Sequence, residues 1–118
     1  MGIKPAHVVI GRMTETNSTT GVAAGHFQWD SDEYQDANIG LRLVLKTSNI
    51  AATCMVEIIK VGTSPTVVKT SMSTSTSFEQ LLEEFDLETA GNGLYEVRVY
   101  TTDSQYSVSL GLAELVLS

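Results

Sequence analysis

The sequence contains few of the residues that cross-link or interrupt a fold. It has one cysteine, Cys54, which excludes an intramolecular disulfide, and only two prolines, both outside the segments with the clearest strand pattern. No stretch approaches the ~20 consecutive apolar residues of a membrane-spanning helix. The first residues, Met1 to Pro5, lack the apolar run of a secretory signal, so we expect synthesis in the cytoplasm without a signal peptide.

Positive charge is also scarce. Seven Lys and Arg residues stand against 14 Asp and Glu residues, which gives a net charge of −7, and the basic residues are scattered along the chain. Binding to a nucleic-acid backbone or to an anionic membrane needs several basic groups on one surface. We therefore predict that the protein binds neither nucleic acid nor membranes.

Serine and threonine supply most of the polar character instead, with 12 Ser and 14 Thr among 118 residues. Threonine is β-branched and favours strands, whereas runs of both residues are typical of loops. Charged residues make up only 18%, which argues against disorder and against a long solvated helix. The length fits one domain, which we place at residues 7–118 after an N-terminal arm of residues 1–6.

Alternation of apolar and polar residues predicts about eight strands. The clearest is 39–47, where Leu41, Leu43 and Leu45 share one face and Val44 is the single apolar residue on the other. Segment 78–87 combines a helical stripe with a strand pattern, and we interpret it as one helical turn or an irregular entry, followed by a strand from about Glu83. The other strands are expected at 7–13, 22–29, 53–61, 66–71, 94–102 and 106–117.

A change of phase near residues 111–114 indicates a bulge or a break in the last of these segments. Short strands at intervals of about 8–12 residues, separated by turn residues, are typical of sandwiches and barrels. We therefore predict an all-β protein, a two-sheet antiparallel β-sandwich that is jelly-roll-like.

The sequence shows no arrangement of residues suited to catalysis. A nucleophile needs an adjacent base, and only His7 and His26 are available, while Cys54 falls on the core side of a strand. Two histidines and one cysteine, far apart in the sequence, do not suggest a zinc site. Glu83 and Glu84 are adjacent, so they lie on opposite faces of a strand and do not form the carboxylate pair of a glycosidase. We predict that the protein is not an enzyme and has no catalytic residues.

A cluster of acidic residues at 30–36 is a candidate calcium site, formed by Asp30, Asp32 and Asp36. The spacing begins like an EF-hand, but Gln35 occupies the sixth position and Leu41 the twelfth, so the EF-hand pattern fails. Sandwich proteins also bind Ca²⁺ in less regular loops, and the alternative is a solvated turn. No other cofactor is expected.

Two aromatic residues and the N-terminal region are candidates for partner binding. Tryptophan and tyrosine are enriched at protein contacts and can stack on sugars, although a single tryptophan also commonly packs in a core. An arm can become ordered on binding, and a first strand can extend a neighbour's sheet; ordinary edge-strand packing is the alternative. The candidate residues are Ile3, Pro5, Val8, Ile10, Trp29 and Tyr100.

The last third of the chain resembles the closing strands of jelly-roll modules. Phe78, Leu81 and Phe85-Asp86-Leu87 are followed by Gly93-Leu94-Tyr95-Glu96-Val97-Arg98-Val99 and then by Leu115-Val116-Leu117. This pattern, over about 40 residues, is similar to that of carbohydrate-binding modules. It is also similar to that of small phage virion proteins, which include capsid decoration (cement) proteins and tail-fibre modules.

A free-standing, acidic and hydroxyl-rich chain favours the phage proteins among these relatives. The resemblance then implies a non-enzymatic structural virion protein of a bacteriophage. It would be a decoration protein that binds and stabilises the assembled lattice of major capsid protein, as a homotrimer. The alternative is a carbohydrate-binding or adhesin module of the tail-fibre type, with Ca²⁺ as a candidate requirement.

Overall fold

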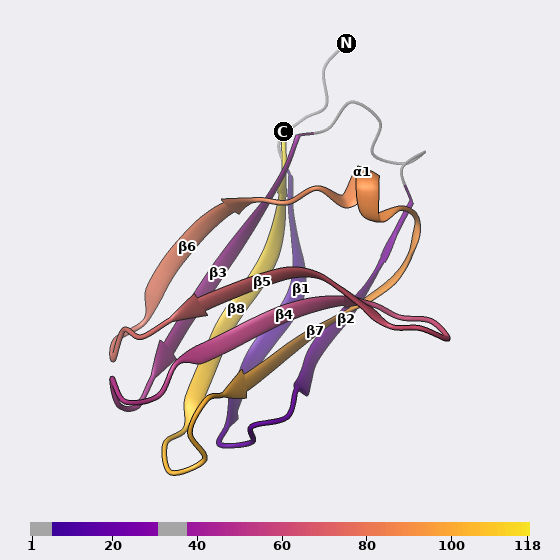
Figure 1. Ribbon diagram of the computed structural model, residues 1–118. Coiled ribbons are helices and arrows are strands. Elements are labelled where there is room, and N and C mark those ends of the chain that lie inside the picture. The colour runs from indigo at the N-terminus through magenta and orange to yellow at the C-terminus, as the bar shows by residue number, and fades with distance from the viewer. Residues whose placement is uncertain (1–5, 31–37) are drawn as a thin grey trace.

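The computed structural model describes residues 6–30 and 38–118, which form two four-stranded antiparallel sheets that face each other (Figure 1). We name them sheet A, with the order β1-β8-β3-β6, and sheet B, with the order β2-β7-β4-β5. Sheet A consists of β1 (Ala6–Thr16), β8 (Val108–Leu117), β3 (Ile39–Thr47) and β6 (Glu79–Glu84). Sheet B consists of β2 (Val22–Trp29), β7 (Gly93–Thr101), β4 (Cys54–Lys60) and β5 (Thr66–Ser73).

The strand order is that of a jelly roll. Apart from the β4–β5 hairpin, successive strands alternate between the two sheets, and the first and last strands, β1 and β8, pair side by side. This arrangement of eight strands in two sheets confirms the predicted two-sheet antiparallel sandwich. Across the described ranges, no helix has both the length and the apolar character needed to cross a bilayer.

The core forms between the sheets from side chains that alternate along each strand. Leu43 and Leu45 of β3 and Val97 of β7 are completely buried, as period-two alternation requires. At the end of the sandwich near the C-terminus, Phe27 stacks on the buried ring of Tyr95 with centroids 5.2 Å apart. Aromatic pairs at this separation contribute stabilisation beyond the area that they bury.

The change of phase near the C-terminus is a bulge within one continuous strand. The pairing between β3 and β8 passes from Leu45–Leu110 to Val44–Leu112, so Gly111 has no partner in β3. An unpaired residue reverses the alternation that follows it. Leu110 therefore faces the core, whereas Leu112 faces outward beside Val44.

For residues 78–87, the predicted start of the strand near Glu83 and the alternative of a preceding helical turn are wrong. The strand comes first, as β6, and a single helical turn, α1 (Leu87–Ala90), follows it. Pairing with β3 holds β6 extended, with Leu81 directed toward the core. The turn begins where the Asp86 carboxylate accepts a hydrogen bond from the Thr89 amide at 3.0 Å, an N-cap contact that the strand pattern did not indicate.

The two sheets are joined along both sides of the sandwich. On one side the backbones of β1 and β2 approach so closely that a Cβ added to Gly25 would lie 2.9 Å from the carbonyl carbon of Ile10. On the other side, Glu83 of β6 pairs with Lys69 of β5 at 3.4 Å and accepts a hydrogen bond from Ser71. Both long faces of the sandwich, by contrast, are open.

Candidate functional site

The nucleophilic and basic groups are not arranged for catalysis in the described part of the chain. Burial raises the pKa of the Cys54 thiol to about 12, and its Sγ donates to the carbonyl oxygen of Ser109 at 3.8 Å. A thiol with this pKa is almost entirely protonated at neutral pH and is a poor nucleophile. Each histidine ring contacts a carboxylate: His7 contacts Glu114 at 3.3 Å, and His26 contacts Glu96 at 2.9 Å.

The predicted calcium site falls mainly outside the described residues. Asp32 and Asp36 lie in the segment 31–37, which the structure does not describe, and Asp30 follows the end of β2. Within residues 6–30 and 38–118, no group of three or more His, Cys, Asp or Glu side chains is placed to hold a metal ion. Calcium binding by Asp30, Asp32 and Asp36 therefore stays a prediction.

The candidate partner-binding residues have different positions in the fold. Ile3 and Pro5 lie outside the described residues, and Val8 packs against the core from β1. Ile10 and Trp29 are each only 2% exposed, so their side chains are core residues and do not form a contact surface in this fold.

Tyr100 is the described candidate that faces outward, from β7 on sheet B. Burial, followed by the charge of Glu57 and a hydrogen bond to it, raises the pKa of Tyr100. Its role in partner binding stays a prediction.

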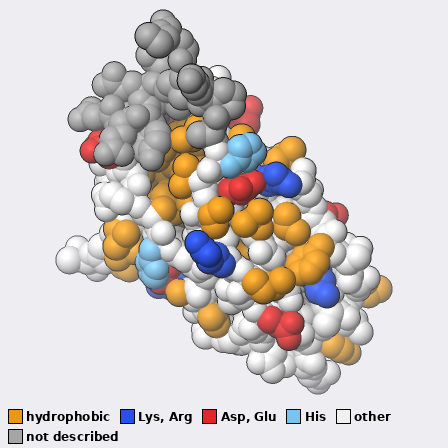
Figure 2. Space-filling model, turned by 180° about the vertical axis from the view of Figure 1, so that it is seen from behind, with side chains coloured by type: hydrophobic (Ala, Val, Ile, Leu, Met, Phe, Trp, Pro, Cys, Tyr) orange, Lys and Arg blue, Asp and Glu red, His pale blue; other side chains and the backbone are white. Residues whose placement is uncertain are grey.

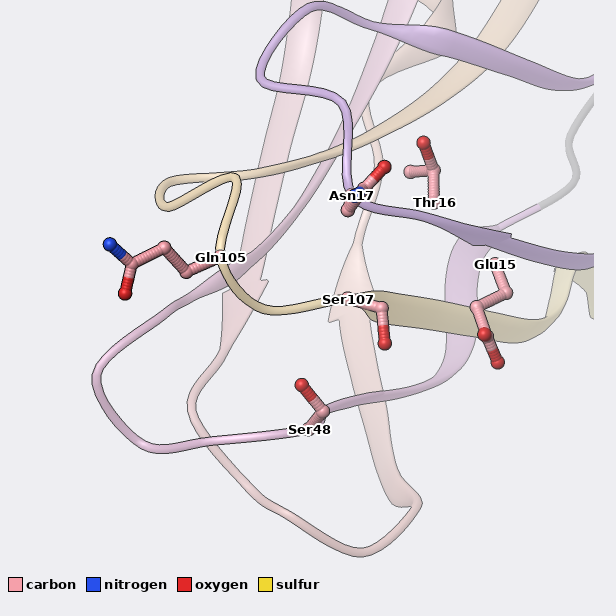
Figure 3. A pocket seen from close by; sticks show the side chains of 6 residues that line it. All are labelled: Glu15, Thr16, Asn17, Ser48, Gln105 and Ser107. Atoms are coloured by element: carbon pink, nitrogen blue, oxygen red, sulfur yellow. The ribbon is translucent and has the colours of Figure 1, made fainter.

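A polar hollow of about 420 Å³ lies at the end of the sandwich opposite Trp29 (Figure 3). Three separate parts of the chain contribute to it: the end of β1, the loop after β3 and the loop between β7 and β8. The residues that line it are Glu15, Thr16, Asn17, Ser48, Gln105 and Ser107. Hydroxyl, amide and carboxylate groups suit hydrogen bonding to a polar ligand, and this set contains no histidine, no cysteine and no aromatic platform.

The outer face of sheet A carries more apolar surface than the sequence pattern indicated. Hydrophobic side chains gather across the rear view of the molecule, among a few charged ones (Figure 2). Val9 is 48% exposed and Leu82 67%. Between them, Leu112 and Val44 are half-buried neighbours. Contiguous exposed apolar surface rimmed by polar groups marks interaction sites.

An ion cluster lies within this apolar surface. Glu114, whose side chain is 9% exposed, lies 3.3 Å from His7 Nδ1 and 3.2 Å from Arg42 Nη1. The Nε of Arg42 is buried and has no hydrogen-bond partner among the described residues. Nearby, the Lys46 ammonium lies 5.0 Å from the centre of the Phe78 ring, a cation–π arrangement that leaves its charge on the surface.

A second hollow, of about 270 Å³, interrupts the same face. It lies at Gly40 of β3, where no side chain separates Val116 of β8 from Leu82 of β6. An added Cβ at Gly40 would have its nearest neighbours 3.6 and 3.9 Å away, so a side chain would fit. The hollow is therefore open space on the surface.

Sheet B presents a different outer face, on which charged groups satisfy one another. Glu96 of β7 accepts a hydrogen bond from Nε of Arg98 and contacts His26 of β2. Burial alone would raise the pKa of Glu96, but the hydrogen bond and charge of Arg98, followed by those of His26, lower it. Val67 and Met72 of β5 in sheet B are also exposed, so sheet B carries apolar surface beside these ion pairs, whereas on sheet A the apolar surface surrounds the Glu114 cluster.

Comparison with known proteins shows the fold and no family. No protein-family model and no curated protein matches the sequence. Among solved structures, the VP2 subviral particle of infectious bursal disease virus has a TM-score of 0.58 and 15% identity, over 97% of this chain and 32% of that chain. The T13 viral particle of the same virus gives a TM-score of 0.55 and 16% identity, over 97% of this chain and 30% of that one.

The Gt strain of this virus gives similar values, with a TM-score of 0.57 and 15% identity over 97% of this chain. This chain spans about a third of the length of these structures. At such low identity the likeness shows the fold alone. An eight-stranded sandwich like this one occurs as part of longer chains in virus particles.

Proposed function

We propose that the protein is a non-enzymatic structural component of a virion. The observation that carries this proposal is the fold match over 97% of the chain to a part of virus-particle chains. The apolar outer face of sheet A supports it, because such surface suits a protein that functions in an assembly. The contacts of Cys54, His7 and His26 supply no activated nucleophile and agree with a structural role.

More specifically, we propose a capsid decoration protein that binds the assembled shell of a bacteriophage and resides in the virion. The resemblance of the closing strands to decoration proteins supports this step, and it implies a trimer on the lattice of major capsid protein. A protein that binds only the assembled lattice stabilises the lattice by its binding free energy. Repetition of the contact by symmetry increases the total effect through avidity.

The test uses shells of the encoding phage that were assembled without this protein. Purified protein is added, and binding is measured by co-sedimentation together with the temperature at which the shells dissociate. We expect saturation at a fixed ratio to capsid protein, a higher dissociation temperature and no binding to unassembled capsid protein. Equal binding to unassembled subunits, or the absence of this protein from purified virions by mass spectrometry, would refute the decoration role.

A carbohydrate-binding or adhesin module is the second candidate. The polar hollow lined by Glu15, Asn17 and Gln105 supports it, because amide and carboxylate groups bind sugar hydroxyls. A glycan array with and without Ca²⁺ tests this function. Binding that is lost in Asn17→Ala and Gln105→Ala would support it, and a Ca²⁺ requirement would involve Asp30. An absence of binding to every glycan on the array would leave the structural role as the single proposed function.

A further inference from the structure

We propose that the outer face of sheet A binds a second copy of this chain, face to face, about a two-fold axis parallel to the strands. The proposal follows from the strand register and does not depend on the virion role. It also concerns a surface that no partner-binding prediction from the sequence included.

The register places the outward side chains of sheet A in rows that cross all four strands. Val9 pairs with Glu114, Glu114 with Arg42, and Arg42 with Leu82, so these four residues form one row. The rows on either side are built in the same way. In the strand order β1, β8, β3, β6, the first row is His7, Val116, Gly40 and Glu84, the row just described is the second, and the third row is Arg12, Leu112, Val44 and Gln80.

A two-fold axis between β8 and β3 brings complementary residues together. In the dimer that this axis generates, each β8 residue lies over the β3 residue of the same row in the second copy. Each β1 residue likewise lies over the β6 residue of the same row in the second copy. Glu114 then faces Arg42 of the second copy, while Leu112 faces Val44. At the sides, Val9 faces Leu82. Every one of these contacts occurs twice, because the interface is self-complementary.

The first row adds a match of shape. Val116 of one copy lies over Gly40 of the other, where the hollow of about 270 Å³ has room for a side chain. In the same row His7 faces Glu84, which pairs a basic group with an acidic one. Charge and shape therefore favour the same arrangement.

The other axis in the plane of the face gives a poor fit. A two-fold axis perpendicular to the strands keeps each strand over itself. Midway between the second and third rows it would place Glu114 over Leu112 and Arg42 over Val44, and through the second row it would place Glu114 over Glu114 and Arg42 over Arg42. Charged groups would then lose water without gaining a partner, which is unfavourable. The charge pattern thus selects the axis parallel to the strands.

The packing of sheets tolerates this arrangement. Aligned sheets pack about 10 Å apart with their strands rotated by roughly 30°. Val9 and Leu82 lie about 7 Å from the axis, so this rotation displaces them by about 4 Å, which side chains can span. The face covers about 600 Å² in projection, against ~800 Å² per partner in a standard interface. We therefore expect a dimer that depends on concentration.

The first test is the mass of the full chain by sedimentation equilibrium from about 1 to 500 µM. We expect the mass to rise toward twice 12.7 kDa. If the proposed trimer also forms through other surfaces, the contact would give six copies. An even number of chains therefore supports the contact, whereas a monomer or a plain trimer at the highest concentration overturns it, whatever the outcome of the shell-binding experiment.

Two charge variants test the axis itself. Val9→Asp and Leu82→Lys change exposed residues, so both variants should fold, which circular dichroism and urea unfolding would verify. Each variant alone places a charge over an apolar residue, and we expect association at least 10-fold weaker. When the two variants are mixed, the introduced Asp of one copy faces the introduced Lys of the other at one contact. At the second contact the unchanged Leu82 faces the unchanged Val9, so the mixture should associate again. A mixture that remains monomeric would overturn the proposed register.

Filling the hollow is the third test, with a matched control. Gly40→Val places a β-branched residue in a strand at a site with room for it, and it should block Val116 of the second copy. We expect dimerisation to weaken at least 10-fold. Gly62→Val makes the same change where no atom lies within 4 Å and should leave the mass unchanged. A different outcome is that the unchanged protein is a monomer and that the Val9, Leu82 and Gly40 variants no longer bind shells. In that case the outer face of sheet A binds the shell, and the dimer proposal is wrong.

Discussion

The close approach of β1 and β2 predicts that Gly25→Ala is strongly destabilising. An added Cβ at Gly25 would lie 2.9 Å from the carbonyl carbon of Ile10, and closer still to its oxygen. Carbon atoms normally approach to about 3.5–4.0 Å, so the carbon contact alone requires the strands to separate by at least about 0.6–1 Å, and the closer oxygen requires more. Because Ile10 belongs to the core, this movement also disturbs its packing.

We estimate the cost at about 2–3 kcal/mol, in the upper part of the range for overpacking, since both contacting groups are backbone atoms. Urea unfolding measures this cost through the fluorescence of Trp29, the single tryptophan, which is buried in the native state. With a slope of about 1.5 kcal/mol/M, the midpoint should fall by about 1–2 M.

Gly62→Ala is the matched control for this experiment. It makes the same chemical change in the turn between β4 and β5, where an added Cβ meets nothing within 4 Å. We expect a free energy of unfolding within about 0.5 kcal/mol of that of the unchanged protein, or a slight stabilisation from reduced freedom of the unfolded chain. If Gly25→Ala unfolded at the same midpoint as Gly62→Ala, the inferred contact between β1 and β2 would be refuted.

Three further predictions concern buried or paired groups. Because burial raises its pKa to about 12, Cys54 should react with a thiol reagent only as fast as the protein opens; rapid labelling of the native protein would contradict this. Tyr95→Phe removes a hydroxyl that donates to the carbonyl oxygen of Gly91, and should cost about 1–2 kcal/mol in urea unfolding. The lowered pKa of Glu96 means that its contribution to stability is present above pH 4.5 and is lost as the pH falls through the folded-state value. Glu96→Gln should therefore flatten the acid limb of the stability profile, and an unchanged limb would show that the pairing with Arg98 contributes nothing.

Much of the fold could be predicted from the sequence because alternation is a local property. The strands at 22–29 and 39–47 have the predicted bounds, since each is followed by polar residues, although only 39–47 alternates along its whole length and β2 has a register shift between Ala23 and Gly25. The segment around Phe78 and Phe85 was harder, because a helical stripe and a strand share several positions. Residues 79–84 form a strand because they pair with β3, which is distant in the sequence.

The candidate surfaces were harder to predict than the fold. The polar hollow joins Asn17, Ser48 and Gln105, which only the tertiary structure brings together. On sheet A, Val44 was visible as an exception to alternation. Its neighbour Leu112 follows Leu110 at the spacing of residues that share one face of a strand, and only the bulge at Gly111 turns it outward. Because of this single unpaired residue, alternation in the sequence did not predict that Leu112 lies on the outer face of sheet A.

The charge distribution shows why the outer face of sheet A is where two copies can meet. The chain carries a net charge of −7, so two copies repel each other at long range. On this face, however, Arg12, Arg42 and Lys46 balance three acidic residues, Glu15, Glu84 and Glu114. The rest of the sequence has four basic residues against eleven acidic ones. Contact through this face therefore brings together locally neutral surfaces, and it removes exposed apolar side chains from water without opposing charges of one sign.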